Sequence, residues 1–256
     1  MTLAGRVRRR FPIGALTVGV VAVSTTFALV ASCGSEAPVA APTTAAAAPL
    51  APSAEVAGAT EVRPLVPAEL ESRLRSAVLE VRSTGCGFDR QGTVSLVDLG
   101  GGPTAMTNRH VVAGSSDAQV VLPDGSLVGA PVEGAVRDRD AATLGIAGLA
   151  DTAAALPAAP TPLVGDEVVV AGFPDGAFVS SPGRVVSIEE RVDDGGDVTV
   201  LLVDVPAASG VSGGVVVDSA GRAVGLVAAR DPDSGNAVAY PFTVLAAPLE
   251  SELPGC

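Results

Sequence analysis

Hydrophobic residues follow three different patterns along this chain. Residues 11–31 are uncharged and mostly apolar, whereas residues 34–66 are rich in alanine, proline and threonine and have almost no large apolar side chains. From residue 78 onward, short valine-rich runs alternate with clusters of glycine, proline and aspartate. Runs of this kind, bounded by turn residues, are typical of β-strands. The third part is therefore predicted to be the folded body.

The folded body is predicted to be almost entirely β. Residues 67–78 have helical spacing and begin with proline, which favours one short helix there. From residue 78 onward the pattern is β, beginning with the run 78–82. Further candidate strands lie at 92–99, 104–108, 118–123, 127–136, 142–148, 167–174, 183–192, 198–206, 214–219 and 223–231. Short strands in this number, without a long helix, predict a β-barrel or a β-sandwich.

The N-terminal pattern predicts export from the cytoplasm. Arginines precede the apolar run, and small residues precede Cys33 in "VASC", so residues 1–32 read as a secretory signal. The ending "VASC" resembles the bacterial lipobox, in which the cysteine becomes the lipidated first residue. An uncleaved transmembrane anchor is the alternative, since the apolar run could just span a bilayer. Either interpretation places the folded body outside the cytoplasm, at the outer face of the membrane or secreted.

The segment 33–66 is predicted to be a disordered tether. It cannot bury enough apolar surface to offset the entropy lost on ordering, and its prolines stiffen it. The folded domain is then 67–256.

Charge excludes one class of function. The net charge is −12, and every positive side chain is an arginine. Four of these arginines lie in the predicted signal, so the mature chain is more acidic still. No basic stripe is left to neutralise phosphates, and we therefore expect no binding of nucleic acid.

The candidate chemistry centres on His110, the only histidine of the chain, in "TNRHVVAG". Ser212 lies in the glycine-rich stretch "GVSGG", where the backbone can turn sharply, and Asp140 opens "DAATLGI" between the two. A hydroxyl nucleophile needs an imidazole to take its proton and a carboxylate to hold that imidazole. A single histidine is usually a packed or surface residue with no catalytic role. A plain β-turn is the alternative interpretation of "GVSGG". The order His110, Asp140, Ser212 changes that assessment.

This order and these motifs resemble the trypsin-like, chymotrypsin-fold serine proteases, and in particular their HtrA-type branch. "TNRHVVAG" is similar to the histidine motif of the family, "DAATLGI" to its Asp-x-Ala-x-Leu strand, and "GVSGGVVVDSAGRAVGL" to its serine loop and the hairpin that follows. "GDEVVVAGFPDG" and "SPGRVVSI" are similar to segments of the HtrA-type branch. The resemblance covers about residues 78–256 and is greatest to actinobacterial envelope proteases.

The resemblance implies a fold and roles for single residues. The fold would be all-β, with two six-stranded antiparallel barrels and the active site between them, after a short N-terminal helix. Ser212 would be the nucleophile, His110 the general base and acid, and Asp140 the residue that orients His110; Asp138 is the rival carboxylate. The backbone N–H groups of Gly210 and Ser212 would form the oxyanion hole. Peptides and proteins would be the substrates, and no cofactor or metal is implied.

Three residues depart from the family pattern. Arg109 replaces a small residue before the histidine, Val211 replaces a polar residue before the serine, and Val215 replaces a proline. They keep a second class of function open, namely a catalytically inactive lipoprotein that uses the same fold for binding. The complete triad in the family's order favours an envelope endopeptidase.

The remaining motifs concern structure. Lipidation of Cys33 would leave Cys86 and Cys256 as an even pair in an oxidising compartment, so a disulfide between them is expected. The bond would tie the two ends of the domain together and support the strands that carry Ser212. Two free thiols, or a bond from Cys256 to another chain, are the alternatives. "DPDSGNA" at 231–237 has the look of a calcium loop but lacks the closing bidentate acid, and it is interpreted as a polar turn.

Overall fold

The structure is a computed structural model. It describes residues 64–65, 67–136, 139–145, 147–149, 154–193, 196–245 and 255–256. The predicted signal 1–32, with Cys33, and nearly all of the tether 33–66 lie outside these residues. Within the described residues, no helix is both long enough and apolar enough to cross a membrane.

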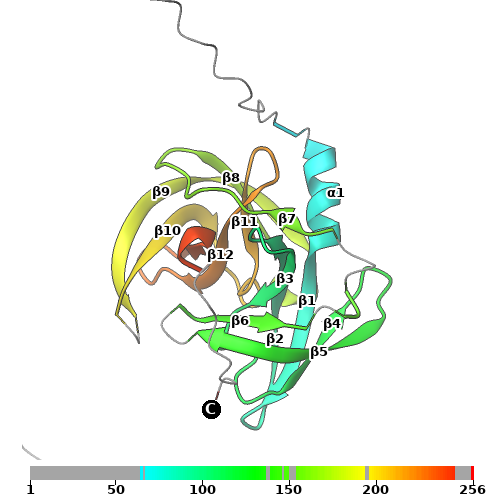
Figure 1. Ribbon diagram of the computed structural model, residues 1–256. Helices are drawn as coiled ribbons and strands as arrows, with labels where there is room; N and C mark the ends of the chain where they lie inside the picture. Colours follow the sequence, from blue (N-terminus) through cyan, green and yellow to red (C-terminus); the bar gives the residue numbers. More distant parts are fainter. Residues whose placement is uncertain are drawn as a thin grey trace, which may run out of the picture. The chain divides into compact units, whose positions relative to one another are not determined.

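The first six strands close into a barrel. Helix α1 (Pro67–Ala77) runs directly into β1 (Figure 1), and β1 pairs with both β2 and β4, which completes the ring β1-β4-β5-β6-β3-β2. All neighbours in this ring are antiparallel. The strands are β1 (Val78–Gly85), β2 (Phe88–Asp98), β3 (Pro103–Thr107), β4 (Asp117–Val121), β5 (Leu127–Val136) and β6 (Ala141–Leu144).

Six further strands form a second closed barrel, in the order β10-β13-β12-β11-β8-β9. The short strand β7 (Leu156–Pro157) connects the two barrels and pairs in parallel with β2. The second barrel consists of β8 (Glu167–Gly172), β9 (Val179–Asp193), β10 (Gly196–Pro206), β11 (Val215–Asp218), β12 (Ala223–Arg230) and β13 (Asn236–Pro241). A 3-10 turn, η1 (Pro174–Gly176), follows β8, and a short helix, α2 (Phe242–Leu245), follows β13.

Alternation of buried and exposed side chains explains why these segments form barrels. In β4, for example, Ala118 and Val120 point inward and their neighbours point outward, as a strand with one face against a core requires. Each barrel has its own apolar interior. A third cluster joins α1 to both barrels through Leu74, Met106 and Leu226, all fully buried. Burial contributes about 1.5–3 kcal/mol for a side chain such as Leu74.

The predicted fold class, two six-stranded antiparallel barrels after a short helix, is confirmed. The predicted helix 67–78 is observed as α1. Two strands were missed: the sequence pattern gave no strand at the two-residue β7 and none at β13, although β13 pairs with both β10 and β12 and closes the second barrel. Leu65, at the end of the predicted tether, lies against the folded domain, because its N–H donates to the carbonyl of Ser219 at 2.9 Å.

Candidate active site

His110 lies in a series of tight turns that follows β3. Successive backbone N–H groups donate to the carbonyl three residues earlier, from Val111 to Asn108 and from Val112 to Arg109. These turns bury Val111 and Val112 in the first barrel and leave the imidazole half exposed, with 50% of the His110 side chain accessible. Residues 108–115, called the histidine turn below, thus hold the imidazole ring at the surface.

Asp140 contacts this histidine through both carboxylate oxygens. Its Oδ2 lies 2.5 Å from Nδ1 of His110, and its Oδ1 accepts the backbone N–H of the same residue at 2.9 Å. When Nδ1 of a neutral imidazole carries the proton, Nε2 has a free lone pair. The carboxylate therefore favours the tautomer that can accept a proton at Nε2. The rival Asp138 lies outside the described residues.

The backbone of Asp140 is also fixed by the histidine turn. Asp140 has a φ of 39°, in the left-handed region that few residues other than glycine, asparagine and aspartate enter readily. Its carbonyl accepts hydrogen bonds from the side-chain amide of Asn108 at 2.8 Å and from the N–H of Arg109 at 3.1 Å. Sequence reasoning missed Asn108. Its place beside His110 in "TNRH" was the available signal.

Ser212 lies in the loop between β10 and β11, and hydrogen bonds fix four consecutive carbonyls of this loop. Asp175 N–H donates to the carbonyl of Ser209 at 3.2 Å, and Gly214 N–H donates to that of Val211 at 2.8 Å. Two further donors come from Thr93 in the first barrel: its hydroxyl binds the carbonyl of Gly210, and its N–H binds that of Ser212, both at 2.8 Å.

These bonds also set the direction of the loop's N–H groups. In a trans peptide the N–H points away from the C=O, and the structure has no cis peptide among its described residues. The N–H groups of Gly210 and Ser212 therefore point away from Asp175 and Gly214. Neither of these two N–H groups donates to a backbone carbonyl among the bonds of the described residues.

Gly92 of β2 brings the histidine turn and the serine loop together. A Cβ on Gly92 would lie 2.8 Å from a methyl group of Val111 and 3.2 Å from the carbonyl oxygen of Ser212. Val111, the neighbour of His110, and the carbonyl of Ser212 thus both lie against position 92, where only glycine fits. Within the described residues, no hydrogen bond joins the Ser212 hydroxyl to His110. Such bonds often tighten only when substrate is bound.

A polar face of β2 connects the two barrels, and sequence reasoning missed it. Gln91, Thr93 and Ser95 alternate along the strand, and each donates a side-chain hydrogen bond to a backbone carbonyl of the second barrel. The acceptors are Phe173 at 2.8 Å, Gly210 at 2.8 Å and Gly213 at 2.9 Å, respectively. Thr93 and Ser95 are buried, which is unusual for polar side chains unless they are hydrogen-bonded. Polar residues at every second position were the signal.

The three departures from the family pattern fit their surroundings. Val211 packs against the interior of the second barrel, where a Cβ on Gly172 would touch it at 2.9 Å. Val215 is fully buried in β11. Arg109 is half-buried and makes no ion pair with an acid of the described part of the chain. Val211 is thus partly buried against the second barrel, which explains an apolar residue at this position.

The expected disulfide joins Cys86 to Cys256, with their Cα atoms 5.6 Å apart. Its place differs from our expectation. Because Cys256 follows the second barrel, we expected the bond to support the strands that carry Ser212. Instead it lies against the histidine turn: Cys86 Sγ is 3.5 Å from the carbonyl of Ala113, and a Cβ on Gly114 would meet both sulfurs. Arg90 donates to the same Ala113 carbonyl at 3.1 Å.

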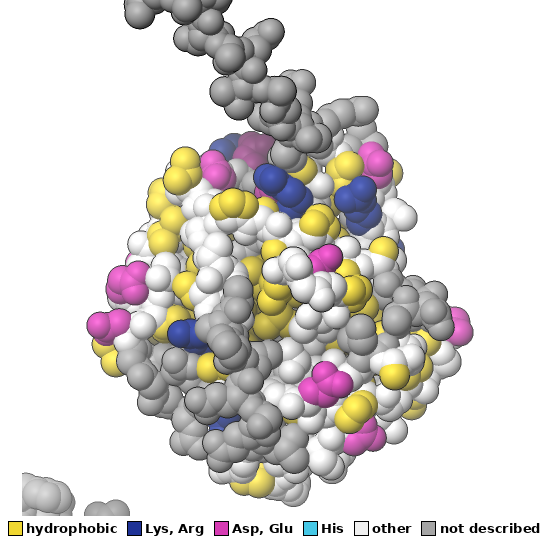
Figure 2. All heavy atoms as spheres, in the orientation of Figure 1, with side chains coloured by type: hydrophobic (Ala, Val, Ile, Leu, Met, Phe, Trp, Pro, Cys, Tyr) yellow, Lys and Arg dark blue, Asp and Glu magenta, His cyan; other side chains and the backbone are white. Residues whose placement is uncertain are grey.

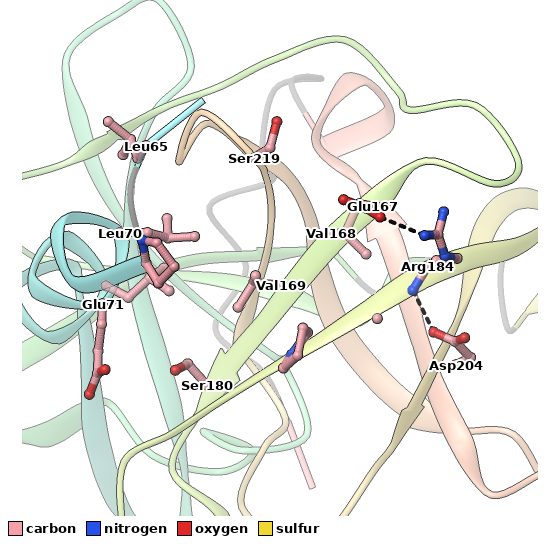
Figure 3. Close-up of a pocket in the computed structure, with 14 residues that line it drawn as sticks. Leu65, Leu70, Glu71, Glu167, Val168, Val169, Ser180, Arg184, Asp204 and Ser219 are labelled. Atoms are coloured by element: carbon pink, nitrogen blue, oxygen red, sulfur yellow. Dashed lines mark hydrogen bonds and ion pairs between the residues drawn. The ribbon is translucent and has the colours of Figure 1, made fainter. Parts of the chain in front are cut away.

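One hollow of the described residues lies away from this site. It is a cavity of about 610 Å³ between α1 and the hairpin β8–β9 (Figure 3), and neither His110, Asp140 nor Ser212 lines it. Leu70 and Val169 give it apolar walls, and the ion pair between Arg184 and Glu167 lies at its rim. Asp204 accepts the backbone N–H of Arg184 there.

Charged groups elsewhere are dispersed or paired. Figure 2 shows acidic (magenta) and apolar (yellow) side chains spread over the same face. In "DPDSGNA", the carboxylate of Asp231 accepts bonds from Ser234 and from Arg191. Among the described residues, no three histidine, cysteine or acidic side chains are grouped so that they could bind a metal.

Solved structures with a similar fold include two proteases. The Rv3671c protease from M. tuberculosis, in its active form, superposes with a TM-score of 0.63 and 25% identity, covering 75% of this chain and 89% of that one. The HtrA-type protease AlgW, solved with a tripeptide, superposes with a TM-score of 0.60 and 24% identity, covering 69% of this chain and 60% of that one. At 24% identity the likeness to AlgW shows the fold.

The sequence comparisons agree with this. "Serine protease Do-like HtrA" of Lactobacillus helveticus is 31% identical over 165 residues, or 60% of this chain and 38% of that protein. The chain therefore spans about two fifths of the length of this relative. The family described as "Trypsin-like peptidase domain" matches residues 90–226, which include His110, Asp140 and Ser212. The chain therefore belongs to the trypsin-like peptidase family.

Proposed function

We propose that the chain is a cell-envelope serine endopeptidase, which cleaves peptide bonds through an acyl-enzyme formed on Ser212. The observation that carries the proposal is the double contact of Asp140 with His110, at Nδ1 and at the backbone N–H. It leaves Nε2 as the proton acceptor on a half-exposed ring. Membership of the trypsin-like peptidase family supports peptides as the substrate class.

The proposed reaction uses three groups in sequence. His110 Nε2 takes the proton of the Ser212 hydroxyl as its oxygen attacks the substrate carbonyl carbon. Asp140 stabilises the imidazolium that results. The N–H groups of Gly210 and Ser212, which point away from the loop's own hydrogen bonds, stabilise the oxyanion. His110 then returns the proton to the leaving amine, and water releases the acyl group by the same steps.

A labelling experiment separates this proposal from a binding module. The purified domain should hydrolyse peptides and should be labelled by a fluorophosphonate, which reacts only with an activated serine. Both should decline on acidification, because a protonated imidazole cannot accept the serine proton. A folded protein that neither hydrolyses peptides nor reacts with the probe would favour the non-catalytic function.

Cleavage is expected after small or medium apolar residues. By the resemblance, the pocket for the residue before the cut lies between 205–210 and 225–230. Pro206 is at the position of its base, where no acidic residue is present. An arginine or lysine would lose its hydration there without gaining a carboxylate partner. Digestion of a peptide library, read by mass spectrometry, checks this; cuts mainly after arginine would contradict it.

Membrane attachment is proposed through a lipid on Cys33. The motif "VASC" after an apolar run supports it. Cells fed a clickable fatty acid should label the wild type and should not label Cys33→Ala. Loss of the lipid should also release the domain from the membrane fraction, since an acyl chain contributes about 0.8 kcal/mol per buried CH₂. Equal labelling of both proteins would indicate an ordinary signal or anchor.

A further inference from the structure

We propose that Thr93 is a positioning residue for catalysis, whose hydroxyl orients the oxyanion hole across the junction between the two barrels. This inference rests on the proposed function, because it assigns the hole to Gly210 and Ser212. Thr93 itself touches no substrate. It lies on β2 of the first barrel, whereas the loop that it orients belongs to the second.

The hydroxyl of Thr93 has two partners, and their chemistry fixes its direction. The backbone N–H of Phe173 can only donate, and it does so to Oγ1 at 2.9 Å. The hydroxyl proton is therefore directed to the carbonyl of Gly210, at 2.8 Å. Thr93 is fully buried, so water cannot replace either bond. One oxygen thus joins the serine loop to the segment that follows β8.

Both hydrogen bonds of the Thr93 hydroxyl restrain the peptide groups of the proposed oxyanion hole. The bond to Gly210 fixes the peptide between the two N–H groups of the proposed hole. The bond from Phe173 anchors the start of the η1 turn, and Asp175 of that turn donates to the carbonyl of Ser209. That second carbonyl sets the direction of the Gly210 N–H. Removing the hydroxyl would therefore loosen this N–H directly and through η1.

Gln91 supports the same arrangement from the neighbouring position on this face of β2. Its side-chain amide donates to the carbonyl of Phe173 at 2.8 Å, and a Cβ on Gly210 would lie 2.8 Å from its Oε1. Phe173 is thus fixed at both its N–H and its C=O by side chains of β2. The N–H of Thr93, which binds Ser212, would be supplied by any residue except proline, so only the hydroxyl requires threonine or serine at 93.

The test is Thr93→Val, which removes the hydroxyl and keeps the shape and β-propensity of the side chain. We expect kcat to fall about 10–100-fold with KM changed less than about 2-fold, because an oxyanion donor acts in the transition state and a displaced one costs less than a deleted one. Affinity for a peptidyl trifluoromethyl ketone, whose adduct places an oxyanion in the hole, should fall in parallel. Thr93→Ser should restore kcat to within about 3-fold of the wild type.

Controls separate positioning from folding. Thr143→Val makes the same substitution at a buried threonine of β6, away from the serine loop, and should leave kcat unchanged. Rates are normalised to active sites titrated with a fluorophosphonate, so unfolded protein does not count. A wild-type kcat in Thr93→Val, or an equal loss in Thr93→Ser and Thr93→Val, would overturn the positioning role alone. A wild type that neither cleaves peptides nor reacts with the probe would overturn the proposed function as well.

Discussion

Replacing Ser212 with alanine is expected to abolish fluorophosphonate labelling and to lower kcat about 10⁶-fold, the order of magnitude seen when the nucleophile of a catalytic triad is removed. In the proposed mechanism, the substitution removes the oxygen atom that forms the acyl-enzyme. It keeps the backbone, whose carbonyl at 212 accepts the N–H of Thr93 and whose neighbours Gly213 and Gly214 are hydrogen-bonded to Val227 of β12. Activity should therefore be lost without loss of the fold, as measured by circular dichroism and thermal unfolding.

A matched control distinguishes this result from general damage. Ser219 is an exposed serine that follows β11, and within the described part of the chain its one hydrogen bond is from the N–H of Leu65 to its backbone carbonyl. Ser219→Ala should therefore keep full labelling and wild-type kcat. Equal labelling of Ser212→Ala and the wild type would show that another residue is the nucleophile, and the roles of His110 and Asp140 would then have to be reconsidered.

Loss of the disulfide should produce the largest change in stability. Cys86 and Cys256 are 170 positions apart. Cross-linking a loop of that length lowers the entropy of the unfolded chain, which raises the free energy of unfolding by roughly 5 kcal/mol at 25 °C. Small domains have a total free energy of unfolding of about 5–15 kcal/mol. Cys86→Ser should therefore lower the melting temperature markedly under oxidising conditions, as calorimetry would show.

The position of the disulfide makes the prediction specific. Because both sulfurs lie against Gly114, hydrogen exchange should speed up first in residues 110–115, and kcat should fall with it. Hydrogen exchange in β11, which follows the serine loop in the chain, should change less. The double variant Cys86→Ser with Cys256→Ser is the control for any effect of an unpaired thiol. A melting temperature and an activity equal to those of the oxidised wild type would contradict the structural role.

The sequence was sufficient to predict those strands and motifs whose pattern lies within a few neighbouring residues. Strands such as β4 and β10 follow from alternation and bounding turns, and the His110, Asp140 and Ser212 motifs each lie within a few residues. It was insufficient for β13, because Asn236–Pro241 is rich in alanine and has little intrinsic β-propensity. Pairing with β10 on one side and β12 on the other makes it a strand. Tertiary contacts of this kind leave no trace in a short window.

The same reason explains what was missed at the site. Thr93 and Asn108 look like ordinary polar residues in the sequence, and their importance comes from carbonyls far along the chain, at Gly210 and Asp140. The disulfide pair was predicted by counting cysteines, but counting gives no information on what the bond lies against. Only the fold shows that the bond lies against the histidine turn.

The late position of β13 in the chain also has a consequence for biosynthesis. A chain that has emerged only as far as Ser212 already contains His110 and Asp140, yet it lacks β12, whose Val227 binds the backbone on both sides of the Gly213–Gly214 peptide, and it lacks β13, which closes the second barrel. The loop would then have no fixed geometry. We therefore expect the proposed proteolytic activity to arise only after β13 has been synthesised, so that an incomplete chain does not cleave itself or its neighbours.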